Sequence, residues 1–75
     1  GVLEPCTVDQ VEIGLDGLVV EGFSRRGLLL PEVAPEYEWT PEQFLVQTCL
    51  KAGLPSDAVE NGARLYRFQT QRFGD

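Results

Sequence analysis

The sequence contains no histidine, no methionine and only two cysteines. Without histidine the chain lacks the commonest general base and a common zinc ligand, and two cysteines with no Cys-x-x-Cys motif do not complete a zinc site. No stretch approaches the roughly 18 apolar residues that a membrane-spanning helix needs, and no segment has the pattern of a signal peptide. These absences exclude a zinc site built from this chain alone, and they predict no contact with a membrane.

Basic residues are also scarce, with 6 Lys and Arg against 12 Asp and Glu and a net charge of −6. Nucleic-acid binding needs clustered cations to neutralise phosphates, and only Arg25 and Arg26 are adjacent, so contact with nucleic acid through this chain is not expected. We interpret the acidity as a solubilising surface, with an acidic docking face as the alternative. Scattered cysteines in an acidic globular chain favour reduced thiols and a cytoplasmic location, although spacing does not exclude a disulfide.

The chain has 75 residues, which allows at most one domain, and 43% of them are hydrophobic. A chain of this size buries only about 60% of the surface that its unfolded form exposes. The hydrophobic content predicts a folded chain rather than a disordered one. Because methionine is absent and Gly1–Pro5 resembles a strand already under way, we expect a piece of a longer protein.

Several segments have the pattern of β-strands. Apolar residues alternate over 11–15, which predicts a short strand followed by a turn at Asp16-Gly17. Residues 18–20 and 27–30, joined by a polar loop with glycine, predict a β-hairpin. The three leucines at 28–30 do not alternate, so either both faces of that strand are covered or the chain turns at Pro31.

The last strand is predicted from Arg64 onward by a period of two. Tyr66, Phe68 and Thr70 share one face, and we expect this aromatic face to point inward. Arg67, Gln69 and Gln71 would then face solvent. Phe73 falls on the opposite parity and needs a bulge, a neighbouring element or the end of the strand.

One segment has clear helix signals. Thr40 is a plausible N-cap, Pro41 suits the first helical position, and Gln43 completes a capping box. An apolar stripe continues to Ala52, and Gly53 is placed to end the helix. This predicts a helix over 41–52, preceded by a connector over 31–39 with one helical turn. The predicted fold class is α+β, with short antiparallel strands, a β-hairpin and one main helix.

Two groups of residues are candidate binding sites. Arg25, Arg26 and Gly27 place two guanidiniums beside a glycine, a combination that suits a phosphate or carboxylate; the alternative is a solvated turn. Trp39 with Tyr37 could line a pocket, but an aromatic just ahead of a helix more often packs on its first turn, here on Phe44.

The remaining reactive residues favour structural roles. Cys49 lies on the apolar stripe near the end of the helix, where the dipole disfavours a thiolate, so we interpret it as a packing residue. Lys51 fits a partner of the helix dipole. The glutamates at 32, 36, 38 and 42 form a solvated acidic flank rather than a metal site. We therefore predict no catalytic residue, no metal ligand and no cofactor in this chain.

Several motifs occur in a characteristic order: Arg26-Gly27-Leu28-Leu29-Leu30-Pro31, then Trp39, then Phe44-Leu45, then the run from Cys49 to Pro55. This order resembles the carboxy-terminal half of the AMMECR domain family, whose prokaryotic members are often labelled AmmeMemoRadiSam system protein A. The resemblance implies that residues 1–75 are the carboxy-terminal part of one AMMECR-like domain, within a larger two-lobed α+β fold. It also implies that the segment 26–31 faces a groove between the lobes.

The resemblance leaves two functions open, since the family has no established reaction. The first is an interaction or regulatory module whose cleft binds a partner protein or a small anionic ligand, with Arg26, Gly27 and Trp39 as candidate ligand-binding residues. The second is an enzyme whose nucleophilic cysteine lies in an amino-terminal half, where the family carries a Leu-Arg-Gly-Cys-Ile-Gly stretch that is absent here. The family's naming implies Memo-like and radical SAM proteins as partners.

Overall fold

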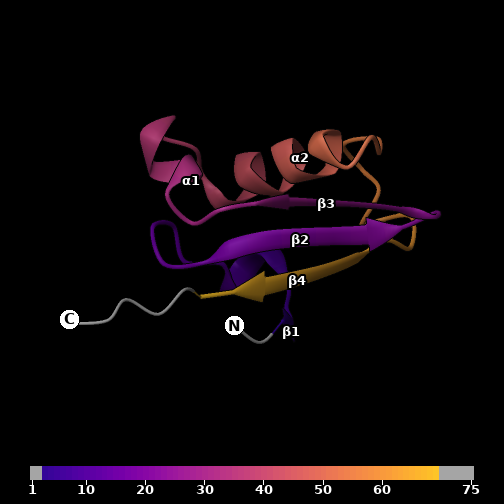
Figure 1. The fold of residues 1–75 in the computed structure, drawn as a ribbon, viewed down its shortest axis with the longest axis horizontal. Helices are drawn as coiled ribbons and strands as arrows, with labels where there is room; N and C mark the ends of the chain where they lie inside the picture. Colours follow the sequence, from indigo (N-terminus) through magenta and orange to yellow (C-terminus); the bar gives the residue numbers. More distant parts are fainter. Residues whose placement is uncertain (1–2, 70–75) are drawn as a thin grey trace.

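The computed structural model describes residues 3–69 and contains one four-stranded antiparallel sheet with helices on one of its faces (Figure 1). The sheet order is β1-β4-β2-β3, so the last strand in sequence lies between the first two. The elements, in chain order, are β1 (Glu4–Pro5), η1 (Val8–Gln10), β2 (Gly17–Gly22), β3 (Arg25–Leu29), α1 (Val33–Glu36), α2 (Pro41–Lys51) and β4 (Arg64–Phe68). The predicted α+β class is confirmed.

The predicted hairpin is formed by β2 and β3. Its two turn residues, Phe23 and Ser24, have φ values of 53° and 64°. Positive φ at both central residues is the signature of a type I′ turn, whose twist matches that of the paired strands. A bulky residue such as Phe23 is uncommon in this conformation, and its side chain is exposed.

The predicted helix is α2, and its amino-terminal end is held as the sequence indicates. The Gln43 amide donates to Thr40 Oγ1 at 3.2 Å, and the Thr40 amide donates to Gln43 Oε1 at 2.9 Å. Trp39 packs on Phe44, with ring centroids 6.2 Å apart. Gly53 has a φ of 77°, which ends the helix in a left-handed residue.

The core lies between the sheet and α2. Leu18 and Val20 of β2 and Leu65 of β4 meet the inner face of α2, where Phe44 and Cys49 are fully buried. The buried Thr48 hydroxyl donates to the Phe44 carbonyl oxygen at 2.7 Å, so the one polar side chain on this face of the helix is satisfied. Cys49 is therefore buried as predicted, and both cysteines are free thiols.

The strand predicted over 11–15 is wrong. Residues 13–15 form a turn, with Gly14 at a φ of 92°, and Leu15 is 56% exposed. The reason is a local closure by Asp16: its carboxylate accepts from the Glu12 amide at 2.9 Å, and its own amide donates to the Glu12 carbonyl oxygen at 2.9 Å. The turn expected at Asp16-Gly17 is wrong as well, because Gly17 begins β2.

The prediction that the aromatic side chains of β4 point inward, toward the core, is also wrong. Leu65 and Arg67 lie on the side of the helices, whereas Tyr66 and Phe68 pair with Val19 and Gly17 on the opposite face. The period of two was correct, but a polar network that includes the buried Asp16 holds Arg67 on the helix side, so the aromatic side chains face away. Thr70, Gln71 and Phe73 lie outside the described residues.

Candidate functional site at the arginine end of the hairpin

Arg25 and Arg26 begin β3, and because side chains alternate along a strand they point to opposite faces of the sheet. Arg25 lies on the helix side, with its guanidinium beside Gly53 at the carboxy-terminal end of α2. This end of a helix carries partial negative charge, which favours a nearby cation. Arg26 lies on the other face. The two side chains therefore leave the strand on opposite faces, although both residues border one hollow at the end of the hairpin.

Arg26 instead belongs to a charged row across three strands. Glu21 of β2 pairs with Arg26 on one side and with Arg64 of β4 on the other. All three residues are exposed, and within residues 3–69 neither Arg26 nor Arg64 forms an ion pair. We call Arg26, Glu21 and Arg64 the arginine row. It places two cations around one carboxylate on an otherwise acidic chain, with the outer Cα atoms about 10 Å apart, two strand spacings.

The sequence did not reveal Glu21 and Arg64 as members of this site. Their positions follow from the pairing register of β2 with β3 and β4, which brings together residues far apart in the chain. The available signal was the alternation itself, since Arg64 begins the period-two segment that forms β4.

Trp39 lies apart from Arg26. Its ring stacks on Tyr37 with centroids 5.0 Å apart, and it borders a hollow over the first turns of α2 with Glu42, Gln43, Val46 and Gln47. The hollow at Arg26 is a different one, of about 340 Å³, formed by residues 21, 22 and 24–26. Trp39 and Arg26 thus sit at opposite ends of β3 and do not share a site. Whether Trp39 contacts a ligand of its own stays a prediction.

Gly27 has a packing reason to be glycine. It is buried beneath the end of α2, and a Cβ there would lie 2.5 Å from the Ala52 nitrogen and 2.6 Å from its Cα. Backbone atoms at these distances cannot yield without moving the helix. Gly27 therefore sets the close approach of α2 to β3.

We expect Gly27→Ala to lower the free energy of unfolding by about 1–3 kcal/mol, because overpacking forces the backbone apart. Arg26→Ala, at the preceding and exposed residue of β3, should change the free energy of unfolding by less than about 0.5 kcal/mol. Urea denaturation of the two variants measures both. A Gly27→Ala variant as stable as the parent protein would show that α2 can move away at no cost.

Comparison with known proteins identifies the family. The family model described as AMMECR1 matches residues 1–73. The chain belongs to the AMMECR1 family. A Thermofilum pendens protein is 53% identical over 66 residues, which are 87% of this chain and 31% of that protein. A Methanothermobacter thermautotrophicus protein is 53% identical over 64 residues, 84% of this chain and 33% of that protein.

A solved structure has the same fold. The crystal structure of an uncharacterized protein from Pyrococcus horikoshii superposes with a TM-score of 0.84 at 38% identity, covering 89% of this chain and 36% of that one. This chain therefore spans about a third of the length of the AMMECR1 relatives it matches. The function of the family domain is uncharacterised.

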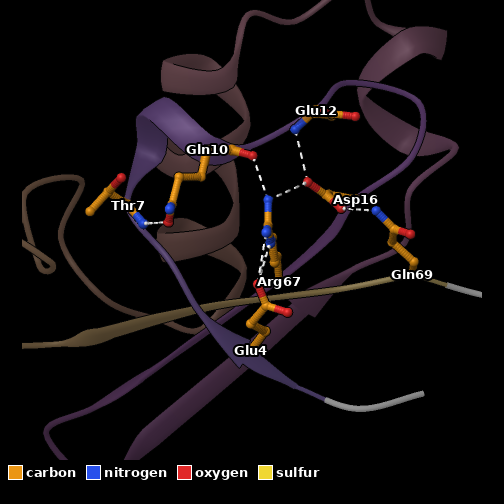
Figure 2. A network of polar contacts seen from close by, with 7 residues as sticks. All are labelled: Glu4, Thr7, Gln10, Glu12, Asp16, Arg67 and Gln69. Atoms are coloured by element: carbon orange, nitrogen blue, oxygen red, sulfur yellow. Dashed lines mark hydrogen bonds and ion pairs between the residues drawn. The ribbon is translucent and has the colours of Figure 1, made fainter.

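A further arginine of this AMMECR1 segment, Arg67, belongs to a polar network (Figure 2). Its guanidinium donates to Glu4 Oε1 at 2.7 Å and to the Gln10 carbonyl oxygen at 2.8 Å, and it lies 3.7 Å from Asp16 Oδ2. The hydrogen bond that Arg67 donates to Glu4 raises the pKa of Arg67 above its ordinary value. Arg67 thus ties β1, η1 and the loop before β2 to β4, and it has fewer free donors for a ligand than Arg26.

Both thiols are placed unfavourably for nucleophilic chemistry. Burial raises the pKa of Cys49, although backbone amides of Val59 and Ala58 oppose the shift. Burial also raises the pKa of Cys6, against the nearby positive charge of Arg67. Cys6 borders a mainly apolar cavity of about 300 Å³ with Leu45, Val59 and Leu65. A thiol with a raised pKa is protonated at neutral pH and is a poor nucleophile.

Over residues 3–69, His, Cys, Asp and Glu side chains form no group of three or more that could hold a metal ion. None of the helices between those residues has the length and hydrophobicity needed to cross a membrane.

Proposed function

We propose that this part of the AMMECR1 domain is a binding module, and that it holds an anionic group of a small ligand or partner protein at the arginine row. The observation that carries the proposal is that Arg26 and Arg64 are both exposed and flank a single carboxylate without an ion pair among the described residues. Exposed guanidiniums without partners are available for charge-assisted hydrogen bonds to carboxylate or phosphate.

The charge of the whole chain makes this row distinctive. The net charge is −6, and Arg67 is already engaged by Glu4 and Gln10. The row therefore offers a local positive potential on a mainly negative surface, which favours an anion at this place rather than elsewhere on the chain. Memo-like and radical SAM proteins, which the naming of the family associates with it, are the partner proteins that we propose to test first.

The enzymatic alternative assigns the nucleophile to a cysteine outside this chain. The raised pKa of both Cys6 and Cys49 supports a non-catalytic role for this segment. If such an enzyme exists, Arg26 would act as an anion clamp at the edge of its cleft. The binding proposal therefore holds for either function of the complete domain.

Arg26→Ala should weaken binding of inorganic phosphate about tenfold or more, because a hydrogen bond to a charged group contributes about 1.5–3 kcal/mol. Arg26→Lys should also weaken it, since a point charge does not reproduce a bidentate contact. Titration followed by the amide signals of Gly22 and Gly27 measures the dissociation constant in each variant.

Lys51→Ala is the matched control, because it removes one exposed positive charge from the last turn of α2 on the helix side of the sheet. We expect it to leave phosphate affinity within about twofold of the parent value. Equal losses for Lys51→Ala and Arg26→Ala would mean that phosphate responds only to net charge, and the proposed site would then be rejected.

A further inference from the structure

We propose that the sheet face opposite α2 is an interface, and that its occupant is the part of the AMMECR1 domain outside these 75 residues. We call this surface the open face. In Figure 1, η1 lies behind β2 and β4, and no helix of the described chain passes in front of these strands. The helices that bury the core residues thus leave the other side of the sheet without a covering layer over residues 3–69.

The open face is apolar next to the arginine row. The strand register places Leu28, Val19 and Tyr66 side by side in one row. In the next row, Gly17 pairs with Phe68, and the Phe68 ring lies against the space where a Gly17 side chain would be. Leu30, just after β3, continues the alternation toward the same face. Two adjacent apolar rows therefore form one continuous surface.

Two large side chains of this surface, at its β3 edge, are exposed in the isolated chain. Leu28 and Leu30 are each 44% exposed. Val19, which lies between Leu28 and Tyr66 in the sheet, is fully buried. The run of leucines at 28–30 is thus apolar on both faces, with only Leu29 packed against the core. A strand that is apolar on both faces is typical of a sheet covered on both sides.

The charges at the edge of the open face argue against a second copy of this chain as its occupant. Two copies could pack their open faces together about a twofold axis. An axis parallel to the strands would place the arginine row of one copy against that of the other. An axis perpendicular to the strands, in the plane of the sheet, would place the arginine row against the row of Phe68 and Leu30. Two copies, each with a net charge of −6, would also repel one another. The two apolar rows instead fit an apolar partner that leaves the arginine row uncovered at its rim.

The length of the relatives indicates where such a partner comes from. The chain covers 31% and 33% of two relatives that are each 53% identical to it, and 36% of a solved chain with the same fold. About two thirds of an AMMECR1 protein therefore lies outside the matched segment. A tethered segment is present at high effective concentration, so it would cover the two apolar rows ahead of a free protein that competes for them.

The test compares thiol labelling of Leu28→Cys with that of Leu50→Cys, in the 75-residue chain and in the full-length AMMECR1 protein that carries it. Leu50, on the outer side of α2, is 52% exposed and so matches Leu28 at 44%. Mass spectrometry of peptides locates the label, and slow labelling of the buried Cys49 shows that each protein is folded. We expect the two introduced thiols to react at similar rates in the short chain. In the full-length protein, Leu28→Cys should react about a hundredfold more slowly than Leu50→Cys, because labelling requires local opening of the interface.

Every other outcome overturns the proposal. Equal rates in the folded full-length protein would show that the open face is not covered by the rest of the domain. Protection of Leu28→Cys in the short chain, together with a doubled mass in sedimentation, would assign the face to a second copy. Protection that appears only when an RNA oligonucleotide is added would assign it to nucleic acid. Because phosphate binding at Arg26 is not part of this readout, failure here is distinguishable from failure of the proposed function.

Discussion

Phe44→Ala should lower the free energy of unfolding by about 3–5 kcal/mol. Phe44 is fully buried at the first inward position of α2, where it contacts the core and packs under Trp39. Truncation removes the buried ring and leaves a cavity that the surrounding residues cannot fill, because β2 and the helix cap hold their positions. Urea denaturation at constant protein concentration measures the loss.

Two variants of the same helix calibrate this result. Thr40→Ala removes the hydroxyl that accepts from the Gln43 amide and should cost about 1 kcal/mol. Leu50→Ala, on the exposed side of α2, should cost less than about 0.5 kcal/mol. If Phe44→Ala were no more costly than Thr40→Ala, α2 would not be packed on the sheet as described.

The helix was predictable because its signals are local. Thr40, Pro41 and Gln43 define its start within four residues, and Gly53 defines its end. These residues act through backbone hydrogen bonds to their own neighbours, so no tertiary information is needed. The structure places α2 over Pro41–Lys51, within one residue of the predicted range.

The sheet was less predictable because strand pairing is not local. A period of two assigns Tyr66 and Phe68 to one face and Arg67 to the other, but it does not say which face meets the helices. Asp16 is buried on the helix side and forms an ion pair with Arg67, which fixes Arg67 on that side of the sheet. The prediction placed Tyr66 and Phe68 on the helix side because they are apolar, and it assumed that the sheet has a single apolar face.

The same limit applies to the candidate site. Arg26 could be identified from its neighbours in sequence, whereas Glu21 and Arg64 join it only through the register of three strands. Gly27 could be identified as a candidate site residue, but its packing role depends on the approach of Ala52, 25 positions later. Residues whose roles depend on such distant partners cannot be assigned without the fold.

Asp16→Ala should lower the free energy of unfolding by about 3 kcal/mol, a large effect for a residue outside the apolar core. The Asp16 carboxylate is fully buried and accepts two hydrogen bonds of 2.9 Å, from the Glu12 amide and from Gln69 Nε2 (Figure 2). Alanine leaves the part-buried Glu12 amide without its carboxylate partner and removes the negative charge near Arg67. The cost arises mainly from desolvated donors left unpaired, rather than from the ion pair itself.

Asp16→Asn separates these two contributions. Its Oδ1 can accept from the Glu12 amide, and its amide group can donate to Gln69 once the Gln69 side chain turns its oxygen inward. Both hydrogen bonds are then kept and only the charge is lost, so we expect a cost of about 1 kcal/mol. Glu4→Ala removes the other carboxylate that meets Arg67, but Glu4 is 62% exposed and such surface pairs contribute about 0–1 kcal/mol. Urea denaturation should therefore rank Asp16→Ala as far more costly than Asp16→Asn or Glu4→Ala. If Asp16→Asn were as damaging as Asp16→Ala, the negative charge opposite Arg67, and not the hydrogen bonds to Glu12 and Gln69, would hold this end of β4 to the helix side of the sheet.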